Sequence, residues 1–236
     1  KYNWLAGNIP TAMLVPQRAF LLGITLGVWS LFLLINAIEL KKNSKNIINH
    51  QKKLLFAGGI LAGLLPIAHM HSFIAVVIIS GLICFADKNN YKKLIYYVLP
   101  AGLLSIFLYF KFVYGGIQID NFMKILIGWT SEKNLFSWIK MWWELWGIMI
   151  PTAIISAMML YQKNKTKLKY FYGFFALFII ANIIIFQPTA WDNTKIFAWA
   201  YVGFSLLAAH LIIELWKKSS KKEKGSISKI KKIIAI

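Results

Sequence analysis

The chain has 236 residues, 58% of them hydrophobic, and a formal net charge of +19. Its polar residues are gathered in short blocks between long apolar runs, which indicates an integral membrane protein and excludes a soluble domain with a buried core. Lysines in short loops between apolar runs follow the positive-inside rule, so we expect no nucleic-acid partner. The single cysteine, Cys84, excludes an internal disulfide and a cysteine-cluster metal site.

Five apolar runs are each long enough to cross a bilayer, which takes about 20 helical residues, or fewer where the bilayer thins locally. Lipid offers no partner to backbone polar groups, and the runs lack strand-like alternation, so we expect helices. In chain order, the predicted spans are residues 19–38, 94–112, 145–161, 170–186 and 196–215.

Residues 54–86 form a further apolar stretch, interrupted only near its middle by Pro66, His69 and His71. It is too long for one span and short for two full ones. We therefore expect two half-length helices that form a re-entrant-like hairpin with these residues at its apex. Together with the five spans, this predicts an all-α, polytopic transmembrane helix bundle of about seven helical segments.

The distribution of charge predicts the orientation of the chain. If the hairpin returns to its own side, one side of the membrane carries 20 Lys and Arg and the other carries 7, whereas a single crossing would divide them 17 to 10. The positive-inside rule favours the hairpin and a cytoplasmic location for the lysine-rich side. We expect a multi-pass plasma-membrane protein with a transmembrane domain over residues 1–216 and a basic cytoplasmic tail over 217–236. Since the chain begins at Lys1 without a visible signal peptide, we expect it to be the C-terminal part of a longer protein.

Residues 134–144 predict an amphipathic helix that lies in the outer interface before the chain turns into the next span. Pro151 is expected to kink that span about two turns after its start. Asn182 and His210 lie inside predicted spans, where we expect hydrogen bonds between packed helices.

With this topology, unusual polar residues gather on the outer side. They are Gln17 and Arg18 at the start of the first span, His69 and His71 at the apex, and Trp191, Asp192, Asn193 and Lys195 between the last two spans. A polar apex below the membrane surface must face protein or water, so we expect a polar cleft. Two histidines at i and i+2 lie on different helix faces, so no metal site is expected.

Several of these residues also have simpler interpretations. Arg18 can bind a phosphate group or extend to lipid headgroups. Asp192 or Asn193 can cap the last helix, and Trp191 can belong to the interfacial aromatic belt.

Three segments carry a family resemblance: Pro-Gln-Arg at 16–18, Leu-Leu-Pro-Ile-Ala-His-Met-His-Ser-Phe at 64–73, and Phe-Gln-Pro-Thr-Ala-Trp-Asp-Asn-Thr-Lys at 186–195. From residue 16 to about residue 200, their order and spacing resemble largely uncharacterised polytopic membrane proteins grouped with the C-superfamily (GT-C) glycosyltransferases. The resemblance implies a multi-helix enzyme that uses a polyprenyl-phosphate-linked sugar at the extracytoplasmic face. No cofactor is expected. The acidic catalytic residue of such enzymes lies in the first outer loop, which has no counterpart here and is expected upstream.

The resemblance and the polar residues together define a candidate site for a polyprenyl-phosphate sugar donor in the membrane lipid. Arg18, His69, His71 and Lys195 are expected to hold the phosphate, with Gln17, Trp191 and Asn193 beside them. Asp192, ahead of Asp120 and Glu132, is the candidate to orient a sugar hydroxyl, to pair with a cation, or to act as general base. A transporter or lipid-binding membrane protein with a polar cavity gated by the hairpin is the alternative, and a structural subunit is a third interpretation.

Overall fold

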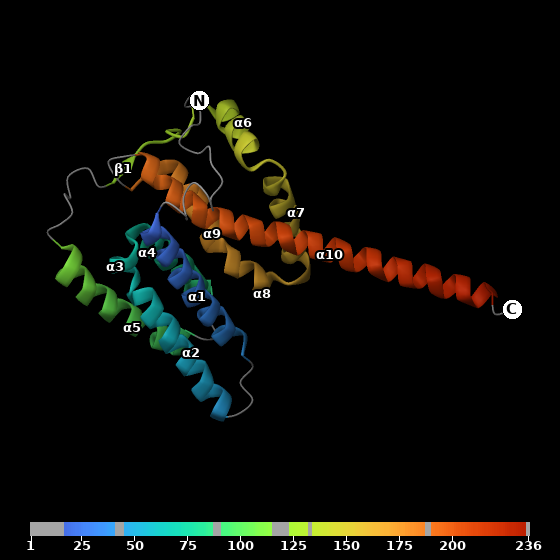
Figure 1. Ribbon diagram of the computed structural model, residues 1–236, viewed down its shortest axis with the longest axis horizontal. Coiled ribbons are helices and arrows are strands. Elements are labelled where there is room, and N and C mark those ends of the chain that lie inside the picture. The colour runs from blue at the N-terminus through green and yellow to red at the C-terminus, as the bar shows by residue number, and fades with distance from the viewer. Residues whose placement is uncertain are drawn as a thin grey trace.

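The computed structural model describes residues 17–40, 45–86, 91–114, 123–131, 134–186 and 190–234. The elements of this part are α1 (Arg18–Glu39), α2 (Lys45–Gly63), α3 (Leu65–Ala68), α4 (Met70–Ala86), α5 (Tyr91–Leu108), the π-helix η2 (Tyr109–Val113), β1 (Lys124–Ile125), α6 (Leu135–Trp146), α7 (Met149–Lys163), α8 (Lys165–Leu168), the 3-10 helix η3 (Lys169–Phe171), α9 (Tyr172–Ile183), β2 (Ile184–Ile185), the 3-10 helix η4 (Ala190–Asn193) and α10 (Thr194–Ile234) (Figure 1). The predicted all-α polytopic bundle is confirmed.

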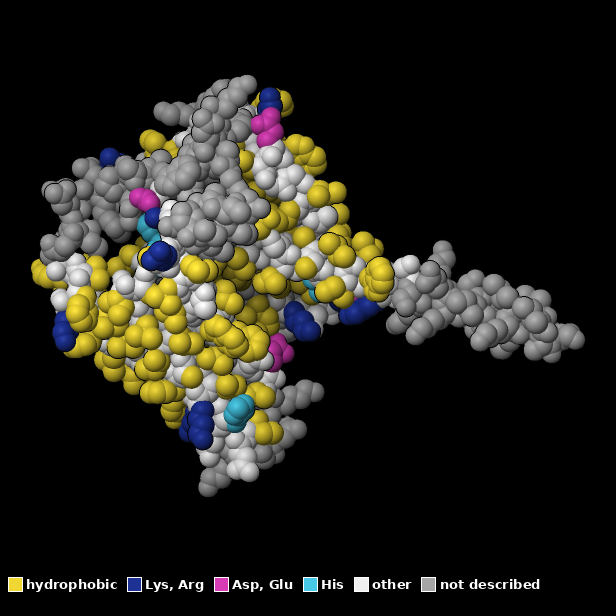
Figure 2. All heavy atoms as spheres, viewed as in Figure 1, with side chains coloured by type: hydrophobic (Ala, Val, Ile, Leu, Met, Phe, Trp, Pro, Cys, Tyr) yellow, Lys and Arg dark blue, Asp and Glu magenta, His cyan; other side chains and the backbone are white. Residues whose placement is uncertain are grey.

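Within the described ranges, four helical segments are long and apolar enough to cross a membrane: Arg18–Glu39, Asn46–Ala68, Lys92–Val113 and Thr194–Ser219. Their outward faces carry large apolar side chains; on α5, Leu103 and Ile106 are more than half exposed. Figure 2 shows hydrophobic side chains covering the face over α2 and α5. Such a surface is stable in lipid and not in water.

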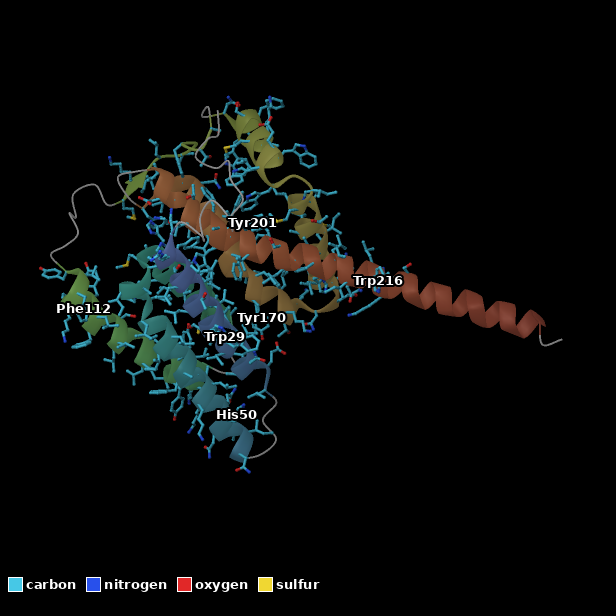
Figure 3. The ribbon with its side chains drawn as sticks, viewed as in Figure 1. Trp29, His50, Phe112, Tyr170, Tyr201 and Trp216 are labelled. Atoms are coloured by element: carbon cyan, nitrogen blue, oxygen red, sulfur yellow. The ribbon has the colours of Figure 1, made fainter. Side chains whose placement is uncertain are left out.

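The helices run back and forth between two ends of the bundle (Figure 1). We call one the apex end; it holds the start of α1, the α3–α4 turn and the start of α10. We call the other the lysine-rich end; it holds the end of α1 and the starts of α2 and α5. Gln51 of α2 connects these helices, because its amide donates to Ala37 O of α1 at 2.6 Å and accepts from Lys93 Nζ of α5 at 2.8 Å. Figure 3 shows His50 of α2 and Phe112 of η2 at opposite ends. The stretch 54–86 is therefore a hairpin that returns to the end where it began, as expected.

The first arm of this hairpin is longer than predicted. Helix α2 begins at Lys45 rather than near Leu54, so this arm has the length of a full span. The apolar run underestimates the helix because polar residues extend it toward its N-terminus. Gln51 is an example, since it is only 2% exposed and both ends of its amide are hydrogen-bonded.

The predicted span 170–186 is only partly helical. Helix α9 ends at Ile183, and β2 then pairs antiparallel with β1, Ile184 opposite Ile125 and Ile185 opposite Lys124. The helix can end here because Asn193 Nδ2 donates to Ile184 O at 2.6 Å and Asn193 Oδ1 accepts from Phe186 N at 2.9 Å. These bonds and the strand pair satisfy backbone groups that lipid would leave unpaired.

Helix α6 covers the residues expected to form an amphipathic helix, and it meets α7 at 92°. The bend lies at Gly147, whose φ of +50° favours glycine. The expected kink at Pro151 is wrong, because Pro151 lies in the first turn of α7. Proline is tolerated there since first-turn N–H groups have no partner within the helix.

Asn182 of α9 anchors α6 to the bundle. Its Oδ1 accepts from Trp138 Nε1 at 2.7 Å, Trp142 Nε1 at 3.1 Å and Thr130 Oγ1 at 3.2 Å. The ring of Trp142 also packs on Phe178 and Phe197, with centroids 4.7 and 4.8 Å away. The expected helix-packing role of Asn182 is confirmed.

The hairpin predicts which loops share a side of the membrane. In a Cys84→Ser background, cysteines at His50 and Lys92 should react with an impermeant thiol reagent from one side, and a cysteine at Lys140 only from the other. Labelling of right-side-out and inverted vesicles measures this. Reaction of positions 50 and 92 from opposite sides would mean that residues 54–86 cross once.

Replacing Asn182 with Ala should lower the free energy of unfolding by about 2–4 kcal/mol, because three donors lose one shared acceptor. The change is measured by thermal unfolding in detergent, in which the fraction of protein that stays in solution is recorded after heating. Asn36→Ala is the matched control, since Asn36 is exposed and, within the described part of the chain, its side chain donates only to Phe32 O of its own helix. Equal loss in both variants would contradict the anchoring role.

Candidate functional site

The α3–α4 turn and α10 pack directly on α1 because two residues of α1 have no side chain. A Cβ atom on Gly23 would lie 2.5 Å from His69 Cβ and 2.8 Å from Ser72 Oγ. On Gly27, it would lie 2.5 Å from the ring of Trp199. The two glycines therefore set how closely the apex of the hairpin and the start of α10 approach the first helix.

A chain of hydrogen bonds fixes the orientation of the His69 ring. Trp199 Nε1 donates to Ser72 Oγ at 3.1 Å, and Ser72 N donates to His69 Nδ1 at 3.2 Å. Since Nδ1 accepts from this amide, the Ser72 hydroxyl, 3.0 Å away, donates to it as well. Neutral His69 therefore carries its ring hydrogen on Nε2, which is available as a donor.

His71 is buried beside this ring and has an unsatisfied nitrogen. Its ring centroid lies 5.3 Å from that of His69, and the residue is 3% exposed. His71 Nε2 has no hydrogen-bond partner among the described residues. A buried polar atom without a partner costs free energy, so it is a position where the polar atom of a ligand would be stabilised.

The loop before α10 brings opposite charges to the same place. Lys195 Nζ lies 2.6 Å from Asp192 Oδ1, and both side chains are largely covered, with 15% and 21% exposed. Lys195 lies one helical turn before Trp199, whose indole donates to Ser72 at the α3–α4 turn, so the ion pair lies at the end of the bundle that holds His69 and His71. Four of the predicted site residues are thus brought together from two segments far apart in the sequence. Figure 2 shows acidic, histidine and basic side chains gathered at the upper left of the visible face.

Two further predicted residues, Arg18 and Gln17, lie at the start of α1. Arg18 is exposed at the start of α1, two residues before Phe20, whose ring centroid lies 5.0 Å from that of His69. Gln17 precedes the helix, and its backbone carbonyl accepts from Phe20 N and Leu21 N. Arg18 and Gln17 therefore lie at the rim of the apex cluster, which we define as His69, His71, Asp192 and Lys195.

The side chain of Asn193 bonds to backbone groups of its own chain and has a structural role. It is fully buried, and its amide is used by Ala181 O, Ile184 O and Phe186 N. Its side chain therefore holds the end of α9 against the start of α10. The side chain of Trp191, and Asp120 and Glu132, lie outside the described residues. In the described ranges, no three His, Cys, Asp or Glu side chains are grouped as metal ligands would be.

Sequence reasoning missed Gly23, Gly27, Ser72 and Trp199, which position the apex cluster. One signal was present, because Gly23 and Gly27 form a Gly-x-x-x-Gly pattern in an apolar helix, which favours close helix packing. Ser72 and Trp199 are 127 residues apart, and no local pattern connects them.

Gly23→Ala should destabilise the protein by about 1–3 kcal/mol, because the added methyl group has no space beside His69 and Ser72. Gly102→Ala is the matched control, since nothing lies within 4 Å of a Cβ atom there. The control should be neutral or stabilising by up to about 1 kcal/mol through helix propensity. Thermal unfolding of both variants in detergent measures this. Equal tolerance of alanine at both positions would contradict the close packing.

Comparisons of the chain with protein-family models, with curated proteins and with solved structures found no match. The GT-C resemblance therefore remains a prediction from the three quoted segments. What the chain does has to be inferred from its fold and from the apex cluster.

Proposed function

We propose that this chain is a membrane-embedded region of a GT-C-type glycosyltransferase, in which the apex cluster holds the phosphate of a polyprenyl-phosphate sugar donor. The observation that carries the proposal is the meeting of the α3–α4 turn, which bears His69 and His71, with the start of α10, which bears the Lys195–Asp192 ion pair, at one end of a membrane-type helix bundle. A lipid-linked phosphate combines an anionic group at headgroup depth with an apolar chain that fits between helices.

The phosphate would be bound by donors from three elements. His69 Nε2–H is presented by the Ser72 and Trp199 hydrogen bonds. Lys195 has three N–H donors, of which Asp192 accepts one. The unsatisfied His71 Nε2 gives another contact, and Arg18 is at the rim for a two-pronged interaction with phosphate oxygens.

In the proposed reaction, an acceptor hydroxyl attacks the anomeric carbon of the sugar, and the bond from this carbon to the phosphate oxygen breaks. The electron pair of that bond goes to the leaving lipid phosphate, whose developing charge the same donors stabilise. Since Asp192 already accepts from Lys195, we assign it the orientation of this ammonium group. Transfer of the acceptor proton to a general base is not assigned to a residue of the apex cluster.

The same proposal gives the protein an orientation in the plasma membrane. The loops of the lysine-rich end, with the residues from 217 onward, contain 20 of the 27 Lys and Arg, so the positive-inside rule places them in the cytoplasm. The apex cluster then opens to the extracytoplasmic side, where GT-C-type enzymes act.

The test is transfer of a radiolabelled sugar from a polyprenyl-phosphate donor by the full-length protein in liposomes. Arg18→Ala, His71→Ala and Asp192→Ala should each lower transfer by about 10-fold to 1,000-fold, because phosphate contacts or their orientation are lost. His50→Ala is the matched control, since His50 is exposed at the lysine-rich end.

Full activity in all three variants would contradict the site. Absence of any binding of the lipid-phosphate donor would contradict the class. Binding of the donor without sugar transfer would favour the alternative of a transporter or lipid-binding protein.

A further inference from the structure

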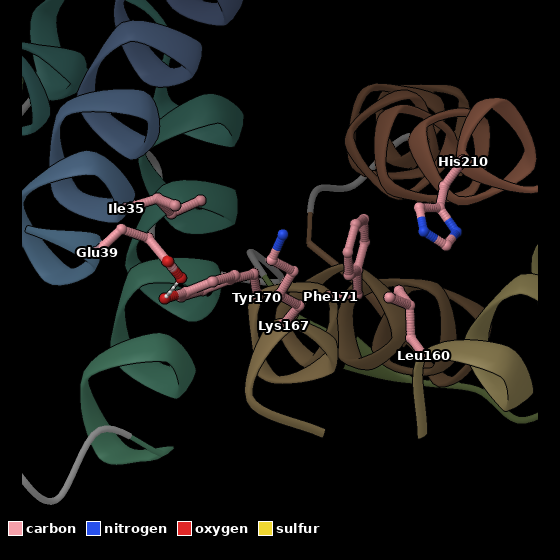
Figure 4. A pocket seen from close by; sticks show the side chains of 7 residues that line it. All are labelled: Ile35, Glu39, Leu160, Lys167, Tyr170, Phe171 and His210. Atoms are coloured by element: carbon pink, nitrogen blue, oxygen red, sulfur yellow. Dashed lines mark hydrogen bonds between the residues drawn. The ribbon is translucent and has the colours of Figure 1, made fainter. Parts of the chain in front are cut away.

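A pocket of about 320 Å³ lies at the lysine-rich end, at the opposite end of α1 from the apex cluster (Figure 4). Side chains of α1, α7, α8, η3 and α10 line it: Ile35, Glu39, Leu160, Lys167, Tyr170, Phe171 and His210. The candidate span of α1 ends at Glu39, so the pocket lies where the membrane-spanning part of α1 meets the headgroup region.

The pocket contains a carboxylate and an ammonium group that are not paired with each other. Tyr170 Oη donates to Glu39 Oε1 at 2.5 Å, which holds the carboxylate on the α1 side. Lys167 forms no ion pair among the described residues. In Figure 4, the Lys167 ammonium and the Glu39 carboxylate lie on opposite sides of Tyr170.

Neighbouring charged groups at this end have other partners. Lys163 pairs with Glu214 at 3.2 Å, and Lys165 lies over the ring of Tyr161 at 4.4 Å. His210 Nδ1 lies 2.9 Å from Ser156 Oγ, which agrees with its expected helix-packing hydrogen bond. Glu39 and Lys167 therefore remain as the two charges of the pocket that can interact with a ligand.

Three of the other lining residues are apolar. Leu160 is buried, and Ile35 and Phe171 are half-buried. A ligand that fits must combine an apolar part with a positive and a negative group, separated so that each meets its opposite charge. A purely anionic headgroup would be attracted by Lys167 and repelled by Glu39.

We propose that this pocket binds a zwitterionic phospholipid with a primary ammonium headgroup, of the phosphatidylethanolamine class. The phosphate contacts Lys167, the ammonium donates to Glu39, and the start of an acyl chain lies along Ile35, Leu160 and Phe171. A choline headgroup is disfavoured, because its quaternary ammonium has no N–H to donate to the carboxylate. This site does not depend on the proposed sugar transfer.

The test is native mass spectrometry of the full chain, purified in detergent and exposed to equal concentrations of phosphatidylethanolamine, phosphatidylcholine and phosphatidylglycerol. One phosphatidylethanolamine molecule should be retained with about tenfold preference over each other lipid. Glu39→Gln should abolish the preference for phosphatidylethanolamine, and Lys167→Gln should weaken its binding by about tenfold. Ile35→Trp, which fills the pocket without removing a charge, should also displace the lipid.

Glu144→Gln and Lys165→Gln are the matched controls, since neither residue lines the pocket, and both should retain the lipid. Thermal unfolding of each variant shows whether it is folded. Equal retention of all three lipids, or unchanged selectivity in folded Glu39→Gln, would overturn the proposal. Preference for phosphatidylglycerol would identify an anionic lipid instead. Displacement of bound phosphatidylethanolamine by an equal concentration of soluble phosphoethanolamine would show that the site binds the headgroup rather than the lipid.

Discussion

Helix α1, the α3–α4 turn and the start of α10 meet in close contact at Gly23 and Gly27. Hydrophobic burial contributes little to helix association in lipid, so close packing and hydrogen bonds between helices must hold the bundle together. Gly23 and Gly27 allow the approach, and the Trp199–Ser72–His69 hydrogen bonds connect the surfaces that meet there. Without this approach, the polar groups of the turn would face hydrocarbon.

The same contact explains why polar residues can gather at the apex end. Ser72 and Asn193 are completely covered, and each has hydrogen-bond partners from within the chain. His71 differs, because its Nε2 is covered without a partner among the described residues. The apex end thus combines polar groups that are fixed by their neighbours with one buried nitrogen, His71 Nε2, that has no hydrogen-bond partner among the described residues.

Much of the architecture could be predicted because lipid permits few forms of backbone. Apolar run lengths predicted α1 and α5, and lysine counting predicted the return of the hairpin. The start of α2 could not be predicted in this way, since it lies in a polar segment outside the apolar run, and the early end of α9 depends on Asn193 bonding to backbone groups beyond the helix. At the apex, residue types predicted which side chains gather. They left open which cation Asp192 pairs with, and they did not predict that Ser72 orients His69, because these contacts depend on helix register and rotation in three dimensions.

The Ser72–Trp199 hydrogen bond also has a consequence for biosynthesis. Its partners are 127 residues apart, and chains are synthesised from the N-terminus, so Ser72 is made long before the indole that donates to it. During that interval, the hairpin must lie in the membrane with the orientation of His69 incompletely fixed. The apex cluster is assembled only when α10 enters the bundle and supplies both Lys195 and Trp199. Helix α10 therefore has to pack on the hairpin before the apex cluster is complete, because it carries both Lys195 and the indole that donates to Ser72.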